Sequence, residues 1–203
     1  MAKLKKTKNA LKAQREALGR YERFLPTLEM KKQQLQREVR QAEVALRKNR
    51  EREREVMDGL RRWAGLLPGA PDLARYLAVE SVDLEAANIA GVNVPALTGV
   101  HLAPAEIDYF ETPVWVDDAV AVLGELIGLR AGARVLERRR DLLGEELRLT
   151  SQRVNLFEKV MIPRTLENIR VVRIALGDAQ TAAVARAKLA KSKAESILSG
   201  AGA

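Results

Sequence analysis

The chain contains no cysteine, a single histidine, and only 4% aromatic residues among its 203. The absence of cysteine excludes disulfides and thiolate metal sites, and it is typical of a reducing, cytoplasmic compartment. His101 has no second histidine or cysteine to share a metal with, so we expect no metal and no cofactor. No stretch approaches the ~20 apolar residues of a membrane-spanning helix. The basic start is followed by no apolar run, so we expect no signal peptide.

The sequence also lacks the short motifs that assemble catalytic groups. It has no Walker-type glycine-rich lysine loop, no dinucleotide fingerprint and no His-Glu-x-x-His pair. Ser81 and Ser151 have no plausible general base beside them. We therefore expect no catalytic residue, and a protein that is not an enzyme by itself.

What the chain does have is a heptad seam over its first 67 residues. Nineteen positions alternate in steps of three and four without a slip, and 14 of them are apolar. This regularity predicts a coiled coil rather than an ordinary amphipathic helix. A helix of that length would extend roughly 95 Å. The positions are Leu4, Thr7, Leu11, Gln14, Leu18, Tyr21, Leu25, Leu28, Lys32, Leu35, Val39, Ala42, Leu46, Asn49, Glu53, Val56, Leu60, Trp63 and Leu67.

Pro26 lies inside this seam, where a proline removes one helical hydrogen bond. The heptad phase is the same on both sides of it, so we expect one bent helix rather than two. Four polar seam residues, Gln14, Lys32, Asn49 and Glu53, either set the register or are tolerated weak points; the sequence leaves both interpretations open.

Residues 68–112 differ from the rest in charge and in pattern. They hold one basic and seven acidic residues, whereas residues 1–67 hold 19 basic and 9 acidic. The apolar period shifts from helical spacing toward two between Val79 and Leu97, with Gly91 and Pro95 as punctuation, which predicts a short hairpin. Residues 98–112, bounded by Pro104 and Pro113, are predicted to be a loop.

Residues 113–203 are predicted to form a second long helix that begins near Pro113. Two successive steps of four, at Met161, Thr165 and Ile169, interrupt its heptads and predict a local unwinding. Pro163 is expected to bend this helix. Three glycines, Gly124, Gly128 and Gly132, share one face, which indicates close packing against another element or, alternatively, local flexibility. Residues 199–203 are expected to fray.

Two long helices that flank a compact insertion most simply fold back on each other. The predicted fold is all-α: an antiparallel two-helix coiled coil with a small inserted hairpin, divided as 1–67, 68–112 and 113–203. Both termini are then expected at the same end. The basic helices leave open a rod that binds nucleic acid, although interleaved acidic residues and the lack of stacking aromatics disfavour it.

Two stretches resemble a known family. Residues 150–164, TSQRVNLFEKVMIPR, are similar to the "RRVNALE…IP" signature of the D subunit of the V-type and archaeal-type rotary ATPases, and residues 88–95, NIAGVNVP, to that family's "NVAGVxxP" hairpin. Residues 4–11 and 24–28 resemble its bacterial V-type branch. The resemblance covers nearly the whole chain in the same order.

The resemblance implies a non-catalytic central rotor shaft that couples ATP synthesis or hydrolysis in a catalytic head to H⁺ or Na⁺ transport through a membrane ring. The implied partners are the catalytic and regulatory head subunits, the small F subunit of the rotor and the funnel-shaped subunit above the ring, with no nucleic acid and no membrane insertion. The implied location is the cytoplasmic face of the membrane.

A stand-alone structural coiled coil remains the alternative function. The candidate contact residues are Asn88, Gly91, Val92, Val94, Pro95, Arg153, Asn155, Glu158, Pro163 and Lys188. We expect the hairpin to bind the small F subunit and to be unnecessary to either helical seam.

Overall fold

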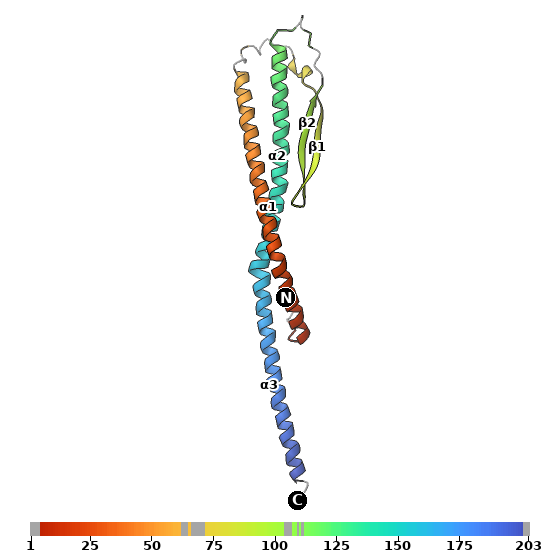
Figure 1. The fold of residues 1–203 in the computed structure, drawn as a ribbon, viewed down its shortest axis with the longest axis vertical. Helices are drawn as coiled ribbons and strands as arrows, with labels where there is room; N and C mark the ends of the chain where they lie inside the picture. The colour runs from red at the N-terminus through yellow and green to blue at the C-terminus, as the bar shows by residue number, and fades with distance from the viewer. Residues whose placement is uncertain are drawn as a thin grey trace. The chain divides into compact units, whose positions relative to one another are not determined.

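The computed structural model describes residues 5–61, 65, 72–103, 107, 108, 110 and 112–200 (Figure 1). The chain divides into two compact units: unit 1 is Met1–Met30 with Ser151–Ala203, and unit 2 is Lys31–Thr150. The N-terminal and C-terminal stretches thus share one unit, as a chain that folds back requires. The elements are α1 (Lys8–Arg61), a 3₁₀ turn (Leu73–Tyr76), β1 (Val79–Ile89), β2 (Val92–Leu102), α2 (Val116–Leu156), a π turn (Phe157–Met161) and α3 (Ile162–Gly200).

Helix α1 confirms the heptad phase. Every predicted seam position from Leu11 to Leu60 is buried or half-buried. Thr7 instead caps the helix, because its Oγ1 accepts a hydrogen bond from the Ala10 N–H at 3.2 Å. Leu4, Trp63 and Leu67 lie outside the described residues. The helix continues through the exposed Pro26, so the sequence correctly predicted one helix there.

In unit 2, α1 and α2 run antiparallel and share a core with the hairpin. Leu35 of α1, Val94 of β2 and Leu143 of α2 form its centre. Ion pairs between the two helices show that they run in opposite directions, because low residue numbers on α1 meet high residue numbers on α2. They are Lys31–Glu146 at 2.7 Å, Glu38–Arg139 at 3.7 Å, Glu53–Arg130 at 3.0 Å, Arg52–Glu125 at 2.9 Å, and Arg50–Glu137.

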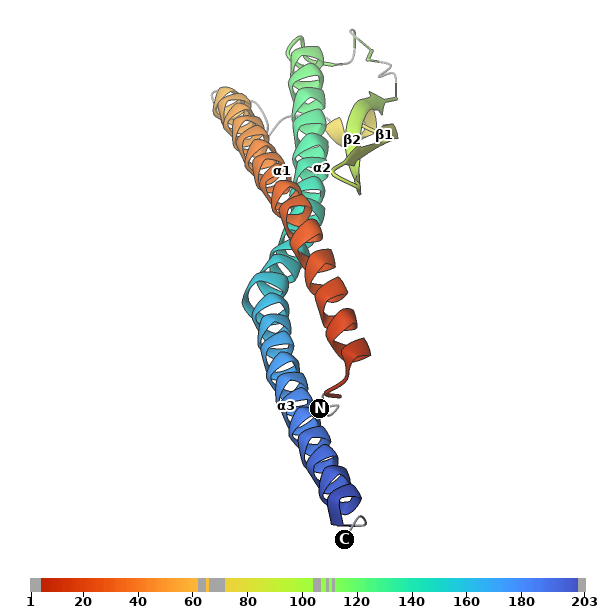
Figure 2. The ribbon, with the colours of Figure 1, turned by 60° about the horizontal axis from the view of Figure 1, so that its bottom comes forward.

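Strands β1 and β2 form a two-stranded antiparallel sheet beside α2, with β2 between α2 and β1 (Figures 1 and 2). Ala90 and Gly91 connect them, with φ of 52° and 79°. Two central residues with positive φ are the mark of a type I′ turn, whose twist matches that of a hairpin. The hairpin was therefore predicted correctly.

The predicted loop at residues 98–112 is wrong for its first part, because β2 continues to Leu102. The apolar alternation that marks a strand fails at Thr98, and the structure shows why. Leu84 pairs with Leu97 but Asp83 pairs with Gly99, so Thr98 is the extra residue of a bulge. Its hydroxyl donates a hydrogen bond to the Asp83 carbonyl at 3.0 Å. Pro104 lies outside the described residues.

Helix α2 begins at Val116, three residues after Pro113, with Asp117 and Asp118 in its first turn as expected. Two of the three glycines on its predicted close-packed face meet the hairpin. A Cβ added to Gly124 would lie 3.0 Å from Leu102 Cδ1, and one added to Gly132 would lie 3.8 Å from Leu97 Cδ2. A Cβ on Gly128 would meet no described atom within 4 Å.

In unit 1, the first part of α1 packs against α3 and the end of the preceding helix. The Tyr21 and Phe157 rings lie 5.3 Å apart, and Asn168 Nδ2 donates a hydrogen bond to Gln14 Oε1 at 3.3 Å. The two seam steps of four begin at Met161, where the π turn at Phe157–Met161 ends. There the Ile162 N–H bonds the Phe157 carbonyl, five residues back.

Pro163 follows the π turn directly and has no N–H to donate. Thr165 Oγ1, buried at the next seam position, donates a 2.6 Å hydrogen bond to the Met161 carbonyl. The sequence thus predicted an irregularity just after its actual position. Its form, one wider turn within a continuing helix, follows from the backbone hydrogen bonds. None of the described helices is long and apolar enough to cross a membrane.

Candidate interaction surfaces

The hairpin tip brings together the five candidate residues between positions 88 and 95. Asn88 Nδ2 donates to Asn93 Oδ1 at 2.7 Å, and Asn88 Oδ1 accepts from the Gly91 N–H at 3.1 Å. Asn88 therefore braces the turn, and Gly91 supplies the positive φ that the turn needs. The tip thus offers a rigid polar surface.

The remaining residues of this group face inward to different degrees. Val94 is 1% exposed and belongs to the core with Leu35 and Leu143, so its side chain offers no free surface in this chain. Val92 and Pro95 are half-buried. The hairpin supplies part of the core of unit 2, so it packs against the seam; that the helices can pair without it stays a prediction. Sequence spacing could not reveal this packing, because it does not tell which elements meet.

The signature segment places Arg153, Asn155 and Glu158 on exposed positions around the start of the π turn, with Pro163 exposed just beyond it. Leu156 and Val160 are each 47% exposed among them. Sequence reasoning missed these two apolar side chains as surface residues. Their positions outside the predicted seam were the available signal. The segment is thus a mixed polar and apolar surface in unit 1.

The C-terminal part of α3 carries the last candidate, Lys188. All side chains from Gly177 to Glu195 are exposed. Val184 and Leu189 are exposed there as well, which the sequence analysis did not single out. This stretch is rich in alanine, carries exposed charged side chains such as Lys188, and has no covering element among the described residues.

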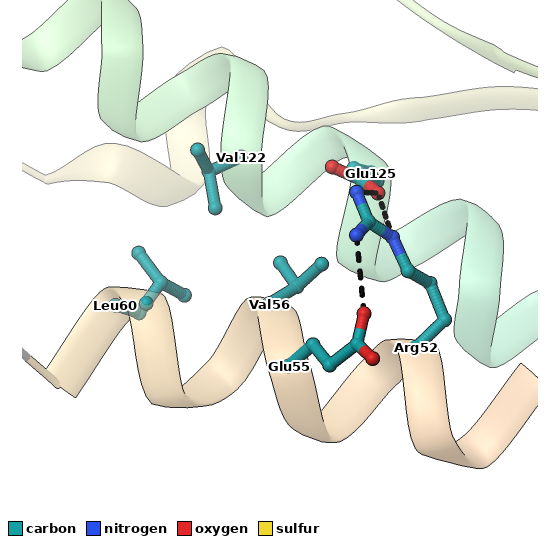
Figure 3. Close-up of a pocket in the computed structure, with 7 residues that line it drawn as sticks. Arg52, Glu55, Val56, Leu60, Val122 and Glu125 are labelled. Atoms are coloured by element: carbon teal, nitrogen blue, oxygen red, sulfur yellow. Dashed lines mark hydrogen bonds and ion pairs between the residues drawn. The ribbon is translucent and has the colours of Figure 1, made fainter.

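A hollow of about 270 Å³ opens between α1 and α2 near the end of α1, with Val56, Leu60 and Val122 along its apolar side (Figure 3). Arg52 spans its rim, donating to Glu125 at 2.9 and 3.1 Å and to Glu55 at 3.2 Å. These hydrogen bonds raise the pKa of Arg52 above its ordinary value. The charges here are satisfied by one another, and no nucleophile or base is poised among the residues that line the hollow. It is therefore a gap in the helix pairing that is bordered by paired charges.

Comparison with known proteins gives consistent matches along the chain. The sequence model of the ATP synthase D subunit family matches residues 10–192. The D subunit of a V-type ATP synthase from Borreliella burgdorferi is 40% identical over 192 residues, which cover 95% of each chain. The protein of the same name from Chlamydia pneumoniae is 35% identical over 198 residues, covering 95% of this chain and 93% of its own. That from Chlamydia muridarum is 34% identical over 195 residues, covering 95% of this chain and 96% of its own.

Proposed function

The chain belongs to the ATP synthase D subunit family, and from this we propose that it is the non-catalytic central shaft of a V-type rotary ATPase or ATP synthase. In this role it couples nucleotide turnover in a catalytic head to ion movement through a membrane ring. The observation that carries the proposal is the match over nearly the full length to relatives named as D subunits of V-type ATP synthases. A stand-alone coiled-coil protein is disfavoured by the same match.

The geometry of both units supports this function. A shaft must transmit torque, and the antiparallel helices of unit 2 are tied by an apolar core and by ion pairs. A shaft must also turn inside a stationary ring, and the exposed alanine-rich cylinder from Gly177 to Glu195 suits a sliding surface. The proposal puts Lys188 and its neighbours inside the ring of catalytic and regulatory head subunits.

The other surfaces suit the remaining rotor partners. The acidic hairpin, with Asn88 and Gly91 at its tip, is the proposed contact for the small F subunit of the rotor. The shaft is also proposed to bind the funnel-shaped subunit above the membrane ring. The signature residues Arg153, Asn155, Glu158 and Pro163 are proposed contacts of unit 1 within the complex. The protein would then be peripheral, on the cytoplasmic face of the membrane.

A reversible disulfide tests the proposed rotation. The chain contains no cysteine, so a single Lys188→Cys variant carries one thiol whose cross-link can be assigned without ambiguity. It is assembled with a catalytic subunit that carries one cysteine on the face lining the ring. Oxidation should stop ATP turnover by the complex, and reduction should restore it, because a shaft fixed to a stationary subunit cannot turn.

The control is a second disulfide, between an exposed hairpin residue, as in Asn88→Cys, and the small rotor subunit. Both partners rotate together, so this cross-link should leave turnover unchanged. Full turnover while the Lys188→Cys variant is cross-linked to the head would exclude the rotor function. Failure of the tagged chain to co-purify with ATPase subunits from its native membranes would favour the stand-alone coiled coil instead.

A further inference from the structure

Strand β1 leaves one of its two edges without a partner strand among the described residues. It pairs only with β2, and its side chains from Val79 to Ala86 are all exposed. Natural sheets protect exposed edges with proline, charged side chains, bulges or very short strands. β1 is 11 residues long and contains neither proline nor lysine; its bulge lies at Glu80, and its carboxylates Asp83 and Glu85 favour a partner of opposite charge. Its open edge is therefore a template for a further strand.

The turn determines which backbone groups point to this edge. In a hairpin with a two-residue type I′ turn, Ile89 and Val92 form a hydrogen-bonded pair, and bonded and non-bonded pairs alternate from there. Ala86 then stands opposite Pro95 in a non-bonded pair, which agrees with the missing N–H of proline. The N–H and C=O groups of Leu84 and Ala86 consequently point to the open edge.

The two faces of β1 differ in chemistry along the same residues. Leu84 pairs with Leu97, and Val82 pairs with Val100, so these side chains lie on the face on which Leu97 approaches Gly132 of α2. Val82 and Leu84 nevertheless remain 43% and 54% exposed, because α2 lies beside β2 and leaves the Val79–Ala86 part of β1 uncovered. The other face carries Ser81, Asp83 and Glu85, all exposed.

We propose that β1 accepts, as a third strand, an extended segment of a partner protein in which basic and apolar residues alternate. Its apolar side chains would cover Val82 and Leu84, and its basic side chains would face Asp83 and Glu85. This mode of binding rests on the proposed role of the hairpin as a partner contact and specifies its chemistry. A second copy of β1 is disfavoured, because antiparallel pairing would bring carboxylates opposite carboxylates.

The experiment uses the full chain and an acetylated, amidated peptide, Lys-Val-Lys-Val-Lys-Val-Lys. Amide hydrogen exchange at Leu84 and Ala86 should slow by about tenfold or more at saturation, because their N–H groups become hydrogen-bonded. A peptide of the same composition with the lysines and valines in two blocks should bind much more weakly, and the alternating Glu-Val peptide should not bind. Equal binding of the block peptide would reduce the interaction to net charge and overturn the proposal.

A matched pair of variants tests the edge itself. Ala86→Pro removes one outward N–H without removing a bond to β2 and should weaken peptide binding by about tenfold, whereas Ala86→Val keeps the N–H and should bind as the parent does. Glu85→Lys changes no backbone group and should also weaken binding, so it serves if Ala86→Pro disturbs the hairpin. Unchanged affinity in Glu85→Lys, or protection confined to amides outside β1, would contradict strand addition.

These outcomes are separate from those of the disulfide experiment. If the chain can be cross-linked reversibly to the catalytic head but does not bind the alternating peptide, the shaft function is supported and strand addition is excluded. If the chain binds the peptide but never co-purifies with ATPase subunits, strand addition is supported and the shaft function is excluded. Dimerisation of the free chain through β1, seen by sedimentation, would replace the partner by a second copy and overturn the proposal.

Discussion

The two units pair their helices by different means. Among the described residues, unit 2 has ion pairs from α1 to α2 over most of its length, from Lys31–Glu146 to Arg52–Glu125. In unit 1, the polar link described between the two helices is the hydrogen bond from Asn168 to Gln14, beside the Tyr21–Phe157 ring contact. Unit 2 is fixed in register by charge, whereas unit 1 is held mainly by apolar packing.

The difference corresponds to the tasks that the proposed function assigns. Charged pairs at specific positions oppose sliding of one helix past the other, because each register shift breaks several of them at once. The hairpin packs Val94 against Leu35 of α1 and Leu143 of α2, and this contact further opposes sliding of the two helices in unit 2. Unit 1 lacks such restraints among its described residues and ends in an exposed cylinder, which suits a surface that meets many partners in turn.

The largest effect should come from a charge in the core of unit 2. Leu35→Asp places a carboxylate at a position that is 0% exposed, and it should lower the free energy of unfolding by roughly 3–5 kcal/mol. Leu28→Asp makes the same change at a half-buried seam position of unit 1 and should cost less. Urea denaturation followed by circular dichroism measures both. Equal losses would mean that the two seams are equally tight.

A smaller effect should follow from removing one charge of an ion pair. Glu38→Gln leaves the partly buried Arg139 without its carboxylate and should cost about 1–2 kcal/mol. The exposed Glu29→Gln on the same helix is the matched control and should change little. Added salt should reduce the difference between the parent and Glu38→Gln, because screening weakens the pair that only the parent has. A difference that is independent of salt would argue for packing instead of charge.

The glycines of α2 provide a comparison within unit 2. Gly128→Ala adds a methyl group into open space and should stabilise the helix by up to about 1 kcal/mol, the propensity difference between the two residues. Gly124→Ala places the same group 3.0 Å from Leu102 Cδ1 and should lose that gain. Thermal unfolding measures both variants. Equal stabilisation would show that the hairpin does not press on Gly124.

The smallest effect concerns one exposed pair on α3. Arg170 donates hydrogen bonds to both carboxylate oxygens of Glu167 at 2.9 Å, and these bonds lower the pKa of Glu167 below its ordinary value of 4.5. The folded state therefore releases this proton more readily than the unfolded state. The pair contributes stability above pH 4.5, which is lost as the pH falls through the lowered pKa.

An NMR titration of the Glu167 carboxyl carbon should show a midpoint below 4.5. The midpoint should return toward that value in Arg170→Gln and should stay low in Arg173→Gln, which removes an exposed charge on the same helix outside the pair. A midpoint that follows Arg173 instead would show that the field of the whole helix, and not this pair, shifts the carboxyl pKa.

Sequence reasoning found what local periodicity encodes. The heptad phase of α1, its passage through Pro26 and the hairpin around Gly91 all depend on nearby residues, and each was predicted correctly. Thr7 was misread as a seam residue, because the heptad spacing extends past the helix start and threonine is also a residue type that caps helices. The bulge at Thr98 and the burial of Val94 could not be predicted, because both depend on which strand or helix lies opposite. The open edge of β1 could not be predicted either, because residue periodicity predicts a strand but not the number of strands that pair with it.

The π turn has a consequence for the azimuth at which α3 presents its surface. One residue of an α-helix turns the chain by about 100°. The π turn places one extra residue within about the same rotation as an ordinary turn, so the residues after it keep the azimuth of the seam. Deleting a single residue within Phe157–Met161 would let the helix close into ordinary turns and would leave Thr165, Ile169 and Val172 in the seam. Deleting a residue of α3 after Pro163 would instead rotate everything that follows by about 100° and turn the later seam residues away from α1. The π turn is therefore the place in this helix at which the loss of one residue preserves the pairing.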